Sequence, residues 1–154
     1  YSGTNPTLYY QIGSTVGSAR RTATNSGAGR WNAVAVPGTF TAWSSGKPVN
    51  VAITEWSAAD TYEAVTSFSC SSGLYTSNKT TITWNSPSPG GIGSNTTALR
   101  MVATHEFGHA YGLNHMSTTC NGTKTVMVQG KTKWSCSWGT EPWQDDINGV
   151  DAIY

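Results

Sequence analysis

The sequence predicts an α/β (α+β) domain in which one sheet of five strands packs against two long helices. Segments of alternating apolar and polar residues lie on both sides of an alanine-rich helical segment, and a second helical segment follows them. No internal repeat or linker divides the chain, and 154 residues are enough to bury one core. We therefore expect one domain over residues 1–154, in the order strand, helix, four strands, helix.

The chain begins with a predicted strand and a predicted helix. Residues 7–12, Thr-Leu-Tyr-Tyr-Gln-Ile, are aromatic and β-branched and favour a strand. Residues 15–36 are rich in alanine and favour a helix, although Gly27 and Gly29 lower the helix propensity there. The Pro-Gly pair at 37–38 predicts the break that follows.

Four further strands are predicted before the second helix, because short apolar runs alternate there with turn residues. They are 40–43, 49–56, 64–70 and 80–85. Residues 86–94 are rich in Gly, Pro and Ser, and we expect a loop there.

The second long helix is predicted over residues 96–112, with Asn95 or Ser94 as its N-cap. Its buried stripe would consist of Leu99, Val102 and Ala103. Residues 116–140 contain many Gly, Ser, Lys and Trp residues and predict irregular chain.

A last helix is predicted to begin near Glu141-Pro142, since proline is favourable in the first turn of a helix. Asp145 and Asp146 would lie near the positive end of the helix dipole. The core face of this helix is expected to carry Trp143, Ile147, Val150 and Tyr154.

The composition excludes several classes of partner. Charged residues make up only 11% of the chain and the net charge is +1, which argues against electrostatic binding of nucleic acid or of a membrane surface. No apolar run approaches the length of a membrane span. Abundant uncharged polar residues together with seven Trp and seven Tyr fit a folded, secreted, extracellular protein, which we expect to be a monomer.

The stretch from His105 to His115 reads H-E-x-x-H-x-x-G-x-x-H and uses all three histidines of the chain. Residues of a helix turn by about 100° each, so His105 and His109 lie on one face and can bind the same metal ion. The carboxylate of Glu106 can contact a water bound to that metal, but its direction on the helix does not suit a metal ligand. Three nitrogen ligands and one open position are typical of catalytic zinc, whereas structural zinc usually has four protein ligands.

His115 would point to a different face if the helix continued through it. We therefore predict that the helix ends at Gly112, because glycine adopts the left-handed conformation of a helix C-terminus without Cβ strain. The chain can then turn back and bring His115 to the metal as the third ligand.

The motif resembles the zinc signature of the metzincin metalloendopeptidases, and the chain resembles the matrixin, or matrix metalloproteinase-like, family within them. Met127 follows His115 by 12 residues and resembles the Met-turn, an apolar support beneath the zinc ligands. Residues 145–154 resemble the C-terminal helix of matrixins. The specific resemblance covers residues 96–154, whereas residues 1–95 match only in the order of strands and helices.

The resemblance implies a metzincin-like fold. Its sheet would be twisted and mixed with five strands, two long helices would lie above the cleft, and a small irregular lower subdomain would end in a C-terminal helix. One catalytic domain would thus consist of an upper subdomain of about residues 1–112 and a lower subdomain of about 113–154.

The resemblance also implies a zinc metalloendopeptidase with one zinc ion bound by His105, His109 and His115. Glu106 would take a proton from the zinc-bound water and pass it to the leaving nitrogen. The substrate would be an extended peptide or protein that pairs with an exposed sheet edge, either 64–70 or 73–77.

The acidic pair of the last helix has a counterpart in matrixins. There the first acid can hold the mature N-terminal ammonium and the second supports the Met-turn. By this resemblance Asp145 would pair with Tyr1, and Asp146 would support the segment around Met127.

Three features differ from the matrixin pattern. No histidines remain for a second, structural zinc, so we expect that site to be absent. Met116 replaces the serine that usually follows the third histidine, and Val128 and Gln129 replace the proline and tyrosine that usually follow the methionine. The specificity of the adjacent substrate pocket is therefore left open.

Two further groups of residues are candidate sites. Glu55, Asp60 and Glu63 fall in one short window and are candidates for a Ca²⁺ site, with solvated surface carboxylates as the simpler interpretation. Cys120 and Cys136 bracket the methionine segment and are candidates for a disulfide, which would leave Cys70 unpaired; three reduced thiols are the alternative.

Two other functions fit parts of the sequence. A zinc amidase acting on cell-wall peptides or other non-protein amides would use the same metal ligands and the same base. A Trp-rich binding module with a structural zinc would explain the tryptophans, but it leaves Glu106 without a role.

Overall fold

The computed structural model describes residues 5–57, 61–68, 70–71, 74–75, 80–86 and 88–154. Its elements are β1 (Thr7–Ile12), α1 (Ser18–Asn32), β2 (Thr39–Ala42), β3 (Val51–Trp56), β4 (Ala64–Ser67), β5 (Cys70–Ser71), β6 (Leu74–Tyr75), β7 (Thr80–Asn85), α2 (Thr96–Tyr111), α3 (Thr132–Ser135) and α4 (Gln144–Asp151). Among the described residues, none of the helices combines the length and the apolar character needed to cross a membrane.

Five strands form a mixed sheet in the order β2-β1-β3-β7-β4. The pairs β1–β2, β1–β3 and β3–β7 are parallel, and β4 runs antiparallel to β7 at one edge. The prediction of one strand over 64–70 is wrong, because β4 ends at Ser67, which pairs with Thr81 near the start of β7. Cys70 instead begins a separate two-stranded sheet of β5 and β6.

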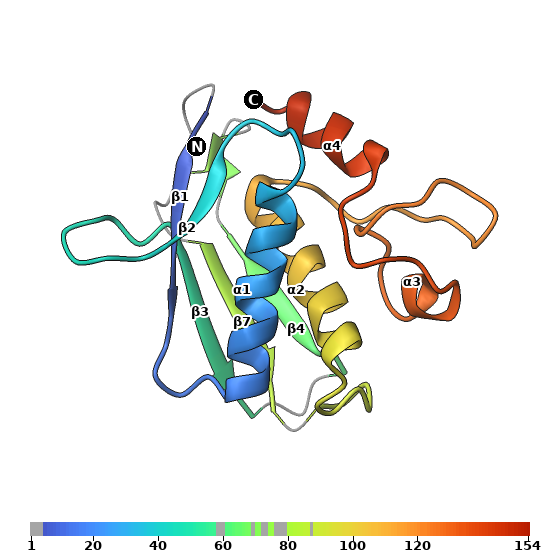
Figure 1. Cartoon of the computed structure of the whole chain (residues 1–154), viewed down its shortest axis with the longest axis horizontal. Helices are drawn as coiled ribbons and strands as arrows, with labels where there is room; N and C mark the ends of the chain where they lie inside the picture. Colours follow the sequence, from blue (N-terminus) through green and yellow to red (C-terminus); the bar gives the residue numbers. More distant parts are fainter. Residues whose placement is uncertain (1–4, 58–60, 69, 72–73, 76–79, 87) are drawn as a thin grey trace.

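The helices α1 and α2 lie side by side over one face of the sheet (Figure 1). The alternation along β1 explains this, since Leu8 and Tyr10 are buried while Gln11 is exposed. Aromatic rings fill the space between sheet and helices, and the Tyr10 and Phe107 rings meet edge to face with centroids 5.6 Å apart. The core of the domain therefore lies beneath the two helices and holds α2 in place.

The first helix is shorter than predicted, covering Ser18–Asn32 rather than residues 15–36, because Gly17 before it is extended. Gly27 and Gly29, which lower the helix propensity of this segment, both lie inside the helix. A Cβ on Gly27 would lie 2.7 Å from the backbone of Ala103, so this glycine permits the close approach of α1 to α2. A Cβ on Gly29 would meet nothing within 4 Å.

The chain after α2 is mostly irregular; in Figure 1, α3 and the loops around it lie to the right of α2, and α4 lies above it. A disulfide joins Cys120 to Cys136, as predicted. The segment predicted to be irregular contains the short helix α3. The last helix begins at Gln144 rather than near Glu141-Pro142, because Trp143 is extended and its backbone N–H donates to Asp146 Oδ2 at 2.8 Å.

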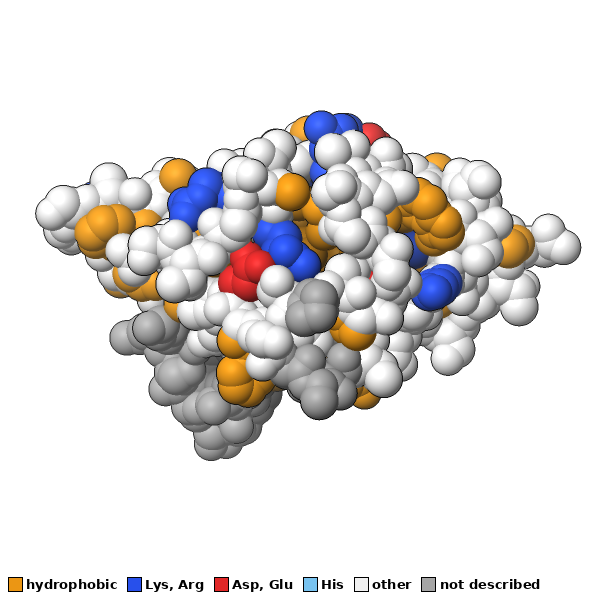
Figure 2. Space-filling model, turned by 90° about the horizontal axis from the view of Figure 1, so that it is seen from below, with side chains coloured by type: hydrophobic (Ala, Val, Ile, Leu, Met, Phe, Trp, Pro, Cys, Tyr) orange, Lys and Arg blue, Asp and Glu red, His pale blue; other side chains and the backbone are white. Residues whose placement is uncertain are grey.

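Charged side chains are sparse on the molecular surface. On the face shown in Figure 2 the described Lys, Arg, Asp and Glu residues are scattered and form no broad patch of one sign. This distribution agrees with the low charge content of the sequence.

Candidate metal centre

The helix that carries the motif is capped at both ends by its own sequence. Asn95, rather than Ser94, is the N-cap, and its Oδ1 accepts hydrogen bonds from the backbone N–H groups of Thr97 and Ala98 at 3.1 Å. The helix ends at Gly112, which is left-handed with φ 107° as predicted. This turn reverses the chain and returns His115 toward α2.

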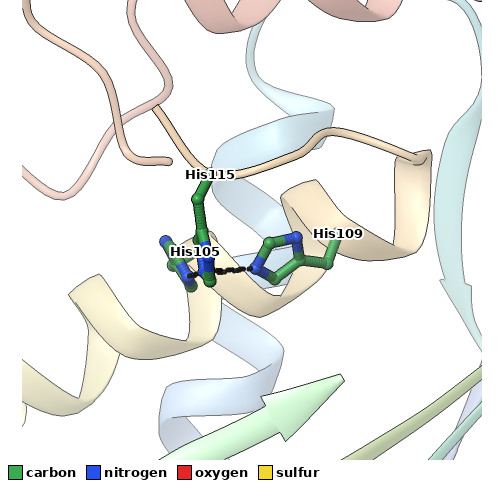
Figure 3. Close-up of side chains that lie close together, drawn as sticks. All are labelled: His105, His109 and His115. Carbon is green, nitrogen blue, oxygen red and sulfur yellow. Dashed lines mark hydrogen bonds between the residues drawn. The ribbon is translucent and has the colours of Figure 1, made fainter. Parts of the chain in front are cut away.

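The three histidines converge on one point (Figure 3). The Nε2 atoms of His105, His109 and His115 lie 3.1–3.2 Å from one another. A tetrahedral zinc site with bonds of about 2.0–2.1 Å places its nitrogen ligands about 3.3–3.4 Å apart. The donor set and its spacing therefore fit a zinc ion, and this is the metal-ligating cluster found among the described residues.

Backbone carbonyl groups orient two of the rings. His105 Nδ1 lies 2.7 Å from Val126 O, and His109 Nδ1 lies 2.7 Å from Leu113 O. A carbonyl only accepts, so Nδ1 carries the proton in both rings and Nε2 is left as a bare acceptor. Burial lowers the pKa of His105 well below its usual value and that of His109 to about 4, which keeps both rings neutral.

Glu106 lies beside this cluster and lines the same cleft. Its Oε2 accepts a hydrogen bond of 2.6 Å from Thr66 Oγ1 on β4. Burial raises the pKa of Glu106 to about 7, while the Thr66 hydroxyl and the Lys133 ammonium act in the opposite direction. Thr66 was missed by the sequence patterns, because it is one of many threonines in strand segments and lies 40 residues from Glu106.

Met127 lies against the helix that carries the first two histidines. It is buried, and a Cβ on Gly108 would overlap its sulfur. Its backbone N–H donates to Thr125 Oγ1 at 2.9 Å. Gly108 therefore leaves the space that lets Met127 pack beneath the turn between His105 and His109.

The two acids of the last helix differ in their surroundings. Asp146 is buried; its Oδ2 accepts from the Val126 backbone N–H at 3.0 Å, and its Oδ1 accepts from the Thr125 hydroxyl. It thereby ties α4 to the segment that precedes Met127. Asp145 is half-buried, and its predicted partner Tyr1 lies outside the described residues.

Lys133 is a second residue that the sequence patterns missed. It is only 8% exposed, and its Nζ donates to Val126 O at 3.3 Å and to Val128 O at 3.2 Å. The same Val126 oxygen accepts from His105. No sequence signal marked it, since lysine in a segment rich in Gly and Ser is usually solvated.

Two of the candidate Ca²⁺ residues, Glu55 and Glu63, are engaged by other groups of the protein. Glu55 accepts from the Gly17 backbone N–H at 2.6 Å and pairs with Arg20 at 3.0 Å, so the expectation of a solvated carboxylate is wrong there. Both oxygens of Glu63 accept from Ser88 Oγ. Asp60 lies outside the described residues.

The histidines lie on a cleft of about 1080 Å³ that is open to solvent. Strand β4 and residues near it line one side, α2 forms another, and the segment 129–134 lines the lower side. Because β4 is the edge strand of the described sheet, its backbone borders the cleft. The predicted alternative edge at 73–77 falls partly outside the described residues.

A model of the matrixin family matches residues 30–154. The chain belongs to the matrixin family. It is therefore a zinc metalloendopeptidase that hydrolyses peptide bonds in a peptide or protein, and the alternatives of a binding module and of an amidase on non-protein substrates are not supported. This family membership also agrees with the three-histidine cluster.

The fold of this matrixin is similar to that of a solved zinc protease. High choriolytic enzyme 1, a hatching enzyme zinc-protease from the medaka fish Oryzias latipes, superposes with a TM-score of 0.58 at 12% identity, over 100% of this chain and 92% of the other. No curated protein matches the sequence. The predicted metzincin-like fold, with its mixed five-stranded sheet and C-terminal helix, is confirmed.

Proposed function

We propose that this matrixin holds one zinc ion on His105, His109 and His115 and uses Glu106 as the proton acceptor for peptide hydrolysis. The observation that carries the proposal is the convergence of three Nε2 atoms within 3.2 Å, in the cleft that Glu106 also lines. When bound to such a site, zinc lowers the pKa of a coordinated water to near 7 and polarises the substrate carbonyl.

Glu106 has the chemistry that the proton transfers require. Its pKa of about 7 lets the carboxylate accept a proton from the attacking water and return it to the leaving nitrogen. Thr66 donates to Oε2 and restrains the carboxylate. Met127 would support the histidine-bearing turn through its contact with Gly108, without acting as a ligand.

The substrate would bind as an extended strand along β4. This strand pairs with β7 on one side, and its residues Ala64, Val65 and Thr66 line the cleft. Backbone hydrogen bonds to the edge of a sheet bind a peptide independently of its side chains. Side-chain pockets of the cleft would then select the residues that flank the cleaved bond.

The proposal includes the setting in which the enzyme works. Residues 1–154 would form one catalytic domain, with an upper part of about residues 1–112 and a lower part of about 113–154, acting as a monomer. The Cys120–Cys136 disulfide favours an oxidising compartment, and matrixins are often extracellular, so we propose that the protein is secreted.

Substitution of Glu106 tests the proposal most directly. Glu106→Ala should retain the fold and the zinc but lose peptide hydrolysis by about a hundredfold to ten-thousandfold, because general base catalysis contributes that much. Zinc content, thermal melting and cleavage of a casein-derived peptide should be measured together.

His109→Ala is the matched control. It removes a ligand, so the zinc content should fall together with activity. Hydrolysis at a near wild-type rate by Glu106→Ala would show that the proposed role of Glu106 is wrong.

A further inference from the structure

The lower side of the cleft contains a buried cation that peptide hydrolysis by Glu106 does not require. Lys133 lies in α3 and lines the cleft together with His105 and the adjoining face of α2. Its Nζ donates to the carbonyl oxygens of Val126 and Val128, and the Val126 oxygen also accepts from His105. The ammonium group is therefore linked to the metal centre through one shared carbonyl.

The ammonium group of Lys133 has an N–H donor that can still form a hydrogen bond. It carries three N–H donors, and among the described residues only the two carbonyl oxygens accept from it. A buried ammonium without a full set of acceptors is costly unless an anion or further acceptors complete it. Burial lowers the pKa of Lys133 to about 8, while Glu106 and Asp146 act in the opposite direction, so the group is charged at neutral pH.

Apolar side chains of α2 line the same cleft as Lys133. Ala98, Met101 and Val102 of α2 line the cleft on the same face as His105. The acids that line the cleft are already engaged, since Glu63 accepts from Ser88 and Glu106 accepts from Thr66. A substrate side chain that enters between α2 and the segment 129–134 therefore has these apolar side chains and the Lys133 ammonium in the same cleft.

We propose that Lys133 is a specificity-determining residue that makes this endopeptidase prefer an acidic side chain at one position flanking the cleaved bond. The inference rests on the proposed function, because it concerns the substrate of the same cleft. The methylene groups of a glutamate would pack against Met101 and Val102, and its carboxylate would accept from the remaining N–H donor of Nζ. A glutamine has the same shape but offers no negative charge to the buried ammonium.

The test uses two peptides that differ only in Glu or Gln. A mixed peptide library first identifies the position next to the cut at which acids are enriched, and the pair is then made at that position. We expect a kcat/KM ratio of Glu to Gln on the order of tenfold for the wild type, as a buried charge-assisted hydrogen bond provides. Lys133→Met should reduce this ratio to about one.

Two controls separate specificity from a structural role. Lys131→Met removes an exposed lysine on the same side of the cleft and should retain most of the ratio. Lys133→Gln keeps a hydrogen-bond donor for the carbonyls of Val126 and Val128 without the charge, and it should also lose the ratio. Zinc content and melting temperature are measured for each variant.

The outcomes distinguish the two proposals. A wild-type ratio of one or less, or a ratio that survives both substitutions of Lys133, would overturn the inference while leaving peptide hydrolysis intact. A loss of activity that is equal for both peptides would identify Lys133 as a support of the segment around Met127 only, and would also overturn the inference. Failure of the zinc-loaded wild type to cleave either peptide would overturn the proposed function along with it.

Discussion

The chain up to Gly112 and the chain after it are held together in different ways. In the first region, strand pairing and two packed helices bury a continuous apolar core that includes Leu8, Ile53 and Phe107. In the second region, α3 and α4 are short, and side chains such as Asp146 and Lys133 bind backbone groups directly. The disulfide between Cys120 and Cys136 closes a loop within this second region.

This difference shows which kind of substitution each region should tolerate. An apolar core is stabilised by many weak contacts, so one altered side chain removes a part of the total. A buried polar residue that satisfies several backbone groups leaves all of them without partners when it is lost. The second region should therefore depend strongly on a few residues, whereas the first should be sensitive mainly to changes of volume.

Asp146→Ala should have the largest effect on stability among these tests. The substitution leaves the Val126 and Trp143 backbone N–H groups and the Thr125 hydroxyl without their acceptor, at a cost of about 3–5 kcal/mol. Denaturant unfolding of the zinc-loaded protein measures it. Asp145→Ala is the matched control, with an expected loss within about 0.5 kcal/mol. A large loss in the control would instead support the tether to Tyr1.

Removal of zinc should weaken the link between the two regions. His105 and His109 belong to α2, whereas His115 lies beyond Gly112, so a shared metal ion joins them. At a free zinc concentration of 100 to 1,000 times Kd, binding stabilises the folded state by about 3–4 kcal/mol. Chelation should lower the melting temperature accordingly, and an unchanged melting temperature would contradict the shared site.

Acid should lower the stability of the folded protein, as removal of zinc by a chelator does. Histidines of the unfolded chain take up protons near pH 6.5, but burial lowers the pKa of all three in the fold, so stability falls as the pH drops below about 6.5. Glu106 has the opposite effect in the metal-free protein. Because its pKa is raised to about 7 in the fold, the folded protein takes up this proton at a higher pH than the unfolded chain does, which stabilises the fold as the pH falls. Metal-free Glu106→Gln should therefore lose more stability between pH 7 and pH 5 than the metal-free wild type.

Loss of the Cys120–Cys136 disulfide should cost about 3 kcal/mol, because it closes a loop of 16 residues in the region with the least regular structure. The double variant Cys120→Ser/Cys136→Ser tests this by thermal unfolding. Reductant should destabilise the wild type and leave the double variant unchanged. If reductant affected both proteins equally, another thiol would be responsible.

Substitution of two glycines in α1 tests how the first region responds to added side-chain volume. Gly27→Ala should destabilise the protein by about 1–3 kcal/mol, since the added methyl group would overlap the backbone of Ala103. Gly29→Ala is the control with open space around it, and it should stabilise the helix by about 0.5–1 kcal/mol. Equal effects of the two substitutions would mean that α1 and α2 do not approach each other as closely as the structure shows.

The sequence by itself determined the local features of this protein. Residues within one short stretch predict the histidine-bearing helix, its end at Gly112 and the separate position of His115. This works because, in a helix, the spacing between two residues fixes the relative directions of their side chains. The number of strands in the main sheet and the pairing of Cys120 with Cys136 were also predicted from short-range patterns.

The tertiary structure alone decided which distant residues meet. Thr66 reaches Glu106 across 40 residues, and Gly27 contacts Ala103 of another helix. Lys133 is buried because its ammonium satisfies two carbonyl oxygens that no periodicity could identify. A hydrophobic pattern specifies the buried face of an element but not its partner, and a polar side chain becomes buried only where the fold supplies its hydrogen bonds.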